Sequence, residues 1–355
     1  MDDKMTKVMN ILNKSLKDDK GLKLFTGDDV ESETAPFGIP TALPYLDLCI
    51  ERPGIAAGKL YELFGFERSG KTTFSLQTAK RVQEIGGGIL WVDAEQAWDS
   101  GGEDRAIELG LDVSNVILAR PKTIEAMFRV QEKVIESIGA AAYNSPFLII
   151  VDSITSVPTE YELKKEMEGE DRTGHEAKVL KRGYRRLMGM LNDSKIPALH
   201  INHAIANPNS FAGTGSGGGH AIKFFASVRL ELKHMKELYK GTDSKKRRLG
   251  QDIKFKIHKN KLGKLRVTEF NAKLLNDGGF NVNLNLHDAL IKVGVIKEVN
   301  SDCSILYPST EMERDFYVDD WDTVMNENGG FTEMYKIFTK AGIENGMMKP
   351  WEVKE

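Results

Sequence analysis

One loop constrains what this chain can fold into more than any other feature. Residues Gly65–Thr72 read G-x-x-x-x-G-K-T, and they lie between an apolar run, Leu60–Phe64, and a helix-like stretch that starts at Thr73. Glycines at both ends let the backbone wrap closely enough for its N–H groups to reach phosphate oxygens, and the following helix N-terminus adds partial positive charge. The pattern predicts a strand, a phosphate-binding loop and a helix in succession, and therefore a site for a nucleoside triphosphate.

The side chains of this loop have separate expected roles. Lys71 is expected to reach the β- and γ-phosphates, and the Thr72 hydroxyl is expected to ligate Mg²⁺. An ordinary glycine-containing loop is the alternative for a chance match, but both flanks also fit the phosphate-binding pattern. The residues predicted to bind the nucleotide are Gly65, Phe66, Glu67, Arg68, Ser69, Gly70, Lys71, Thr72 and Thr73.

Short apolar runs alternate with helix-like periodicity through the middle of the chain. The predicted strands are Leu60–Phe64, Gly88–Val92, Val116–Ala119, Phe147–Val151 and Ala198–Ile201. Predicted helices such as Thr73–Ile85 and Ile124–Ile138 separate them. This alternation predicts an α/β fold with a mostly parallel central sheet covered on both faces, whose ligands bind at the carboxyl ends of the strands.

The composition narrows the class of protein. With 355 residues, 41% of them apolar, the chain can build a sizeable core and two or three domains. A net charge of −3 does not mark a nucleic-acid binder, so such binding must rest on local clusters. Cys49 and Cys303 lack metal-binding spacing and fit buried thiols in a reducing compartment. No apolar run reaches the length of a membrane span, so we expect a cytoplasmic protein without a membrane partner.

Two further acids are expected beside the phosphates. The apolar run Phe147–Val151 is followed by Asp152, and an acid there can hold a water of the Mg²⁺ shell opposite Thr72. Apolar runs that end in Asp are common, so the assignment of Asp152 depends on the presence of the phosphate-binding loop in the same chain. Glu95 follows the strand Gly88–Val92 at the same sheet edge, and we expect it to orient and deprotonate the attacking water. The alternative is that Glu95 caps the next helix or pairs with a surface base.

Six motifs follow one another in a defined order. They are Gly65–Thr73 (GFERSGKTT), Val92–Glu95 (VDAE), Ile150–Ser153 (IVDS), Ile201–His203 (INH), Gly217–Leu230 (GGGHAIKFFASVRL) and Lys259–Lys261 (KNK). In this order they resemble the motifs of RecA-type homologous recombinases, from about Gly21 through the C-terminal region. The INH motif is similar to that of phage recombinases of the UvsX kind, whereas bacterial RecA has Gln in place of His203. A phage and a cellular origin both stay open.

The resemblance implies a RecA-type P-loop NTPase core over residues 34–274. A small N-terminal oligomerisation module over 1–33 and a small α+β C-terminal domain over 275–355 would flank it. Gly21–Phe25 resembles the strand that adds to the sheet edge of an adjacent subunit, although docking on its own core is the alternative. Helical periodicity predicts an amphipathic helix over Asp3–Leu16, which would pack on its own chain or on a neighbour.

Two segments resemble the DNA-binding loops of the family. The first lies near Glu160–Gly174, and the second spans Ala204–His220, whose glycine amides can approach a DNA backbone closely. The residues expected to bind DNA are Lys164, Lys165, Arg172, Phe211, Gly213, Gly215, Gly217, Gly218 and Gly219. The predicted helix His175–Asp193 displays a basic face that is expected to add phosphate contacts. A flexible surface loop and a solvated helix face are the alternatives.

The resemblance assigns catalytic roles outside the phosphate-binding loop. It implies that His203 contacts the γ-phosphate and transmits the ATP state to the second DNA loop, although a lone histidine is more often structural. It also implies that Lys259 and Lys261 reach the γ-phosphate of a neighbouring subunit. These lysines follow a predicted half-buried strand around Ile253–His258, and Leu265–Val267 is expected to begin its return strand. A hairpin with a solubilising polar face is the alternative.

One position departs from the family. Arg105 stands where RecA and its relatives have a tyrosine stacked on adenine. The planar guanidinium group can also stack on a base, so Arg105 is included among the expected nucleotide-binding residues. The base specificity stays open.

Together these implications describe a DNA-dependent ATPase, with ATP and Mg²⁺ as cofactors, that forms helical filaments on single-stranded DNA and catalyses homologous pairing and strand exchange. The expected partners are single-stranded DNA, double-stranded DNA, further copies of the chain, and single-strand-binding and loading proteins. Two other hypotheses are another RecA-fold ATPase, such as a hexameric helicase-type motor, and a non-catalytic recombination mediator. The intact trio Lys71, Glu95 and Asp152 argues against the mediator, and missing primase-like and zinc-finger motifs argue against the helicase.

Overall fold

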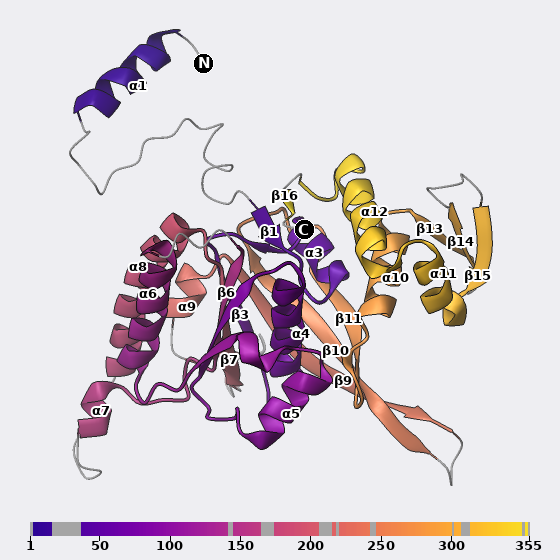
Figure 1. Ribbon diagram of the computed structural model, residues 1–355, viewed down its shortest axis with the longest axis horizontal. Helices are drawn as coiled ribbons and strands as arrows, with labels where there is room; N and C mark the ends of the chain where they lie inside the picture. The colour runs from indigo at the N-terminus through magenta and orange to yellow at the C-terminus, as the bar shows by residue number, and fades with distance from the viewer. Residues whose placement is uncertain are drawn as a thin grey trace.

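A large mixed sheet forms the centre of the molecule (Figure 1). The computed structural model describes residues 3–15, 37–140, 145–164, 174–205, 215–217, 220–241, 246–299, 302–306, 313–349 and 352–353. The main strands run in the order β12-β11-β10-β9-β3-β7-β6-β4-β5. The strands from β9 to β5 in this order are mutually parallel: β9 (Val228–Lys240), β3 (Leu60–Gly65), β7 (Ala198–Ile205), β6 (Phe147–Asp152), β4 (Gly88–Asp93) and β5 (Val116–Ala119). The antiparallel additions are β10 (Arg247–Asn260), β11 (Glu269–Leu275), β12 (Gly279–Phe280) and β8 (Gly215–Ser216), which pairs with β7.

The predicted α/β fold with a mostly parallel sheet is confirmed, and all five predicted strands are present. One of them, β7, ends four residues later than expected. β7 continues to Ile205, because Ala204 and Ile205 pair with β8. His203 therefore lies inside a strand and not just after one.

Helices cover both faces of the sheet because successive strand residues point to opposite sides. They are α3 (Pro44–Ile50), α4 (Lys71–Glu84), α5 (Ser100–Glu108), α6 (Ile124–Ala140), α8 (His175–Ser194) and α9 (Ala221–Phe225). The short helix α7 (Glu160–Lys164) follows β6 in the chain and buries none of its side chains. On one face, Leu63 of β3 and Phe74 of α4 belong to the same buried apolar cluster. On the other face, Val151 of β6 packs in a cluster with Phe128 of α6 and Leu180 of α8. Figure 1 shows α4 in front of the strands and α6 and α8 side by side at the left.

The strand pair β10–β11 agrees with the sequence only in part. Ile253, Phe255 and Ile257 are buried, as the alternating pattern predicts. The prediction that Leu265–Val267 begins the return strand is wrong, because pairing with β10 starts at Glu269. Leu265 has a φ of 54°, in the left-handed region, so the chain bends there and cannot continue an extended strand.

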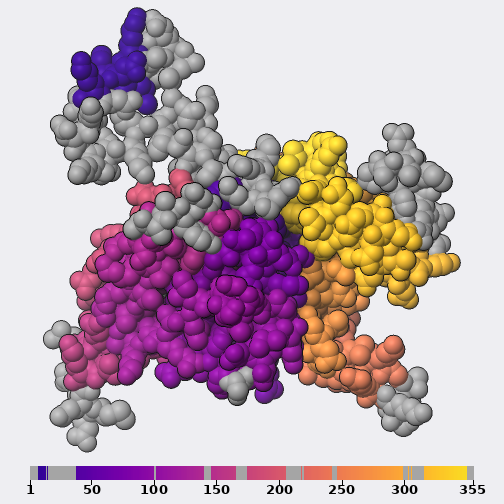
Figure 2. All heavy atoms as spheres, viewed as in Figure 1, coloured from indigo at the N-terminus to yellow at the C-terminus, as the bar shows by residue number. Residues whose placement is uncertain are grey.

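The C-terminal part of the chain combines helices with a small sheet (Figure 1), and its yellow atoms form a lobe at the upper right of the space-filling view (Figure 2). Its elements are α10 (Val282–Lys292), β13 (Ile296–Val299), β14 (Asp302–Leu306), β15 (Glu313–Tyr317), α11 (Trp321–Glu327) and α12 (Gly330–Glu344). A separate apolar cluster holds them together and includes Leu48 of α3, so this part packs against the main body. The last described strand, β16 (Glu352–Val353), pairs with β1 (Phe37–Ile39), which in turn pairs with β2 (Ile55–Ala56).

The predicted N-terminal helix is present as α1 (Asp3–Ser15). Its apolar residues Val8 and Ile11 are 48% and 67% exposed. The expected polymerisation strand Gly21–Phe25 lies outside the described residues. In the described part of the chain, none of the helices combines the length and apolar character that a membrane span requires.

A buried carboxylate joins the main body to the C-terminal helices. Asp47 of α3 is fully buried and accepts a 2.8 Å hydrogen bond from the Tyr335 hydroxyl of α12. Burial raises the pKa of Asp47 from 3.8 to about 7, against the opposing effects of hydrogen bonds from Tyr335 and Thr41 and of the Arg81 charge. The fold therefore favours the protonated side chain.

This raised pKa predicts a stability that falls as pH rises. The contribution of Asp47 is full below pH 4, where both states are protonated, and it is lost as pH rises towards 7. We expect the free energy of unfolding of the parent to decrease relative to Asp47→Asn by up to about 1.4 kcal/mol per pH unit over this range. Urea denaturation between pH 4 and 8 measures this difference. An exposed aspartate variant, Asp319→Asn, is the control, and parallel pH curves for parent and Asp47→Asn would contradict the prediction.

Candidate functional site

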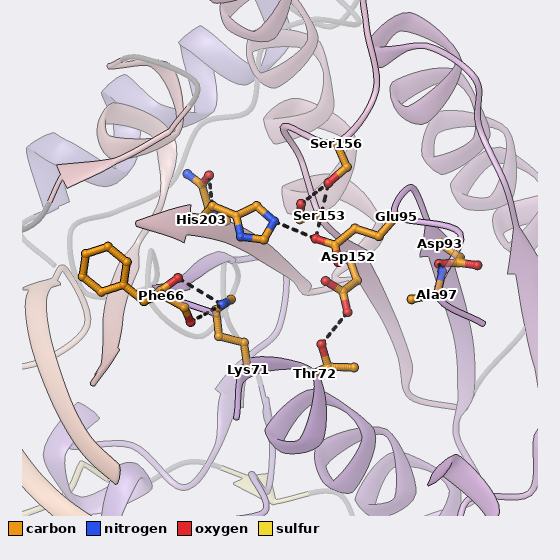
Figure 3. Close-up of polar contacts among 12 residues, drawn as sticks. Phe66, Lys71, Thr72, Asp93, Glu95, Ala97, Asp152, Ser153, Ser156 and His203 are labelled. Atoms are coloured by element: carbon orange, nitrogen blue, oxygen red, sulfur yellow. Dashed lines mark hydrogen bonds and ion pairs between the residues drawn. The ribbon is translucent and has the colours of Figure 1, made fainter. Parts of the chain in front are cut away.

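The predicted phosphate-binding loop joins β3 to α4 and curves around a lysine amine (Figure 3). Lys71 is the first residue of α4, and its amine donates hydrogen bonds to the carbonyls of Gly65 (3.0 Å) and Phe66 (2.9 Å). Burial lowers the pKa of Lys71, and nearby carboxylates, Asp152 first, oppose this shift. A cation enclosed by the loop backbone is the arrangement that the phosphate-binding interpretation requires.

Two glycines make this loop possible. A Cβ at Gly65 would lie 2.3 Å from the Leu232 carbonyl oxygen, which no side chain tolerates. Gly70 has a φ of 87°, and a Cβ there would lie 2.9 Å from the side chains of Leu274 and Phe280. Gly70 is also the N-cap of α4 and supplies no side-chain cap, so the first amides of the helix keep their capacity to bind an anion.

The two residues expected at Mg²⁺ lie against each other. The Thr72 hydroxyl donates a 2.8 Å hydrogen bond to Oδ2 of Asp152, the last residue of β6. Burial, followed by the charge of Glu95, raises the pKa of Asp152 to about 6. Thr72 and Asp152 thus form a pair of adjacent oxygens, the type of ligand that Mg²⁺ prefers.

Glu95 is fixed at the same edge through its backbone and its side chain. Its N–H donates to the Asp152 carbonyl at 3.1 Å. Its Oε1 lies 2.7 Å from His203 Nε2 and 3.3 Å from Ser156 Oγ (Figure 3). The capping alternative for Glu95 is wrong, because Asp99 caps α5, whereas the alternative that Glu95 pairs with a base holds for His203.

Two residues outside the predicted site support its loops. Asp93, at the end of β4, accepts hydrogen bonds from Ala97 N (2.9 Å), Trp98 N (3.1 Å) and Arg120 Nε (3.0 Å), and so holds the loop that carries Glu95. Gln251 of β10 donates to the Arg68 carbonyl at 2.8 Å and steadies the phosphate-binding loop. The position of Asp93 at the end of a strand indicates that it lies near the site. Gln251 is 183 positions from Arg68, so no local pattern in the sequence indicates their contact.

Asn202 links the base of the second predicted DNA loop to the sheet. Its side-chain amide donates to the buried carboxylate of Glu62 at 2.9 Å and to the Gly217 carbonyl at 3.1 Å. Glu62 in turn pairs with Arg229 of β9. Asn202, the residue before His203, is therefore held in the sheet interior by polar contacts.

Lys259 and Lys261 are not brought to their own phosphate-binding loop. Through the strand register, Lys259 lies level with Arg229 and Glu62, three residues or roughly 10 Å before the end of β3. Its amine donates to the carbonyls of Lys223 (2.7 Å) and Phe224 (2.9 Å) in α9. Burial, with the charges of Lys261 and Arg229, lowers the pKa of Lys259 to about 8.

The expected DNA-binding residues are described only in part. Lys164 is exposed at the end of α7. Gly215 lies in β8, and Gly217 donates its N–H to the His203 carbonyl at 2.9 Å. The remaining members of this set lie outside the described residues: Lys165, Arg172, Phe211, Gly213, Gly218 and Gly219.

Arg105 lies in α5 and contacts the turn after β11. Its Nη1 donates to Glu108 Oε2 at 3.0 Å and to the Asn276 carbonyl at 3.3 Å. These contacts fix one edge of the guanidinium group. Its stacking on a base stays a prediction.

Asp93 provides a test of how Glu95 is positioned. In Asp93→Ala, two loop amides and Arg120 lose their acceptor, which corresponds to about 1–3 kcal/mol for unsatisfied groups. We expect the kcat of nucleotide hydrolysis to fall about tenfold or more, with a much smaller change in KM, because the phosphate-binding loop is left intact. Asp112→Ala is the matched control, since Asp112 also caps a short turn but lies elsewhere. Equal kinetic effects of the two variants would contradict this role.

Comparison with known proteins agrees with this geometry. The family model described as the RecA N-terminal domain matches residues 4–281. A protein named Protein RecA from Paenarthrobacter aurescens (strain TC1) is 30% identical over 285 residues, covering 79% of this chain and 77% of that protein. Proteins of the same name from Streptomyces coelicolor and Ureaplasma parvum serovar 3 are each 31% identical, over 74% and 78% of this chain and 67% and 79% of those proteins. Because the family model spans most of the chain and the whole of the site described above, this chain belongs to the RecA family.

Proposed function

We propose that this protein binds ATP with Mg²⁺, polymerises as a helical filament on single-stranded DNA and catalyses homologous pairing and strand exchange. As a member of the RecA family it is an ATP-dependent recombinase of recombination and repair and a DNA-dependent ATPase. The observation that carries the finer proposal is the meeting of Lys71, Asp152, Glu95 and His203 at one edge of the sheet.

The phosphate-binding loop has the features needed for a triphosphate. It encloses the Lys71 amine, and the buried hydroxyl of Ser69 has no hydrogen-bond partner among the described residues, so it is available to a ligand. Thr72 and Asp152 would hold Mg²⁺ directly and through water, and the ion would neutralise phosphate charge. Phe66, Glu67, Arg68 and Thr73 complete the proposed nucleotide site, and Arg105 would lie against the base.

The proposed hydrolysis divides its tasks between two subunits. Within one chain, Glu95 orients and deprotonates the attacking water, and His203 donates a hydrogen bond to the γ-phosphate. Lys259 and Lys261 lie towards the other end of the sheet, so they would act on the γ-phosphate of a neighbour. Two cations supplied in this way would stabilise transition-state charge only in the assembled protein.

An exposed sheet edge supports the proposed assembly. β5 ends the main sheet, and in the described part of the chain no strand pairs with its outer side. Ile117 and Leu118 of β5 are 50% and 39% exposed, and an apolar edge of this kind favours pairing with another chain. We place Gly21–Phe25 of an adjacent subunit there, as part of an N-terminal module over residues 1–33. Head-to-tail contacts would then build a helical filament from cores over 34–274, each followed by a C-terminal domain over 275–355.

The proposed DNA site combines loops with a basic helix. The basic side chains of α8 recur at helical spacing and are exposed: Lys178, Lys181, Arg182, Arg185 and Arg186. Together with Lys164 they would bind phosphates of single-stranded and double-stranded DNA, while glycines such as Gly217 approach the backbone. Single-strand-binding and loading proteins are the further partners of this proposal. The buried thiols of Cys49 and Cys303 fit the cytoplasm as its location.

Lys71→Ala tests the nucleotide site. Loss of the enclosed cation is expected to reduce DNA-stimulated phosphate release and ATP-supported strand exchange by about 10²-fold or more. Phosphate release with and without single-stranded DNA measures the first effect, and a joint-molecule assay measures the second. Lys80→Ala, on the same helix but paired with Glu84, should behave as the parent. Strand exchange by Lys71→Ala at the parent rate would overturn the assignment.

The double variant Lys259→Ala/Lys261→Ala tests the contribution of the neighbour. Nucleotide binding by single subunits should be kept, because these lysines lie far along the strands from their own loop, whereas DNA-stimulated turnover should fall about 10²-fold or more. Nucleotide titration and phosphate release measure the two quantities. Lys336→Ala/Lys340→Ala removes the same charge from exposed sites on α12. Lower stability with full specific activity would show instead that the lysines are structural.

A further inference from the structure

Ser156 contacts the carboxylate of the proposed catalytic base. Its hydroxyl donates to Oε1 of Glu95 at 3.3 Å, and His203 Nε2 lies 2.7 Å from the same oxygen (Figure 3). An ionised carboxylate only accepts hydrogen bonds, with about two acceptor sites on each oxygen. The two partners therefore occupy both sites of Oε1 and hold the carboxylate from two sides.

While Glu95 Oε1 and His203 Nε2 contact each other, this oxygen cannot accept a proton from water and this nitrogen cannot donate to a γ-phosphate. Oε1 has no free acceptor site for the proton of a water molecule. Nε2 cannot donate to a γ-phosphate while it donates to Glu95. The contacts with Ser156 and His203 thus hold Glu95 in a resting position.

The two partners of Glu95 come from the bases of both predicted DNA loops. Ser156 lies in the turn between β6 and α7, and His203 lies in β7. A Cβ at Gly217 would lie 3.3 Å from Cγ2 of Thr155, and the Gly217 N–H binds the His203 carbonyl. The turn that carries Ser156 therefore packs against the base of the second loop, and a shift of Gly217 would disturb both contacts to Glu95.

We propose that Ser156 is a positioning residue that restrains Glu95 in its resting position until DNA displaces the loop bases. The inference rests on the proposed role of Glu95 as the base. Ser153 supports the restraint, because its hydroxyl is hydrogen bonded to that of Ser156 and its carbonyl accepts the Ser156 N–H at 3.4 Å. DNA binding would break the contact between Ser156 and Glu95. Because such coupling is reciprocal, the contact in turn lowers the affinity for DNA.

Ser156→Ala removes the restraint and leaves both proposed catalytic groups in place. Phosphate release without DNA is expected to rise about fivefold, which equals about 1 kcal/mol, the net value of one hydrogen bond. The rate at saturating single-stranded DNA and the KM for ATP should stay within about twofold of the parent, so the stimulation ratio falls. Reciprocity predicts a similar gain in affinity for single-stranded DNA, measured by fluorescence anisotropy with a non-hydrolysable ATP analogue.

Two control variants separate this role from a structural one. Ser156→Thr keeps the hydroxyl at an exposed position and should keep the parent's stimulation ratio. Ser137→Ala removes an exposed hydroxyl that donates to the Lys133 carbonyl on α6, and it should match the parent. An unchanged ratio and affinity in Ser156→Ala, or a lower rate at saturating DNA, would overturn the inference alone. A parent without DNA-stimulated phosphate release would overturn the proposed function as well.

Discussion

The parallel pairing of β4, β6, β7 and β3 is the constraint on which the site depends. Its register places Asp93 level with Asp152 and Gly65 level with His203, so groups from distant parts of the sequence meet at one edge. The strands are buried on both faces, and a shift of one residue would exchange the side chains that pack in the two apolar clusters, such as Ile150 in one and Ile149 in the other. The packing that determines the fold therefore also determines which polar groups meet the nucleotide.

Buried polar side chains hold β7 in place through hydrogen bonds. His200 is fully buried, and its two ring nitrogens meet the Tyr184 hydroxyl of α8 and the Gln131 side chain of α6, each at 3.0 Å. Burial lowers the pKa of His200 to about 3, so the ring is neutral and both contacts are hydrogen bonds between uncharged groups. Asn202 is tied to Glu62 in the same strand pair. The strand that carries His203 is thus fixed to both neighbouring helices and to β3.

The sequence was most informative where a function needs residues close together in the chain. The loop around Lys71 could be predicted because its glycines and its lysine act within eight positions, and the strand before Asp152 because a fully buried strand is a continuous apolar run. The contact between Ser156 and Glu95 spans 61 positions and follows no local spacing, so only the folded chain shows it. The return strand was placed too early because Leu265 and Val267 look like strand residues, while the left-handed backbone at Leu265 depends on packing. DNA-loop residues such as Phe211 stay predictions.

The sheet separates the groups that can act on a chain's own nucleotide from those that cannot. Gly65 ends β3, whereas Lys259 lies level with Glu62, and its amine is held by the end of α9. Lys259 could reach its own loop only if β10 slid along β9, which would move Phe255 and Ile257 out of the apolar core. If these lysines act on a phosphate, it belongs to another subunit. The requirement for assembly would then follow from strand register and not from a separate regulatory element.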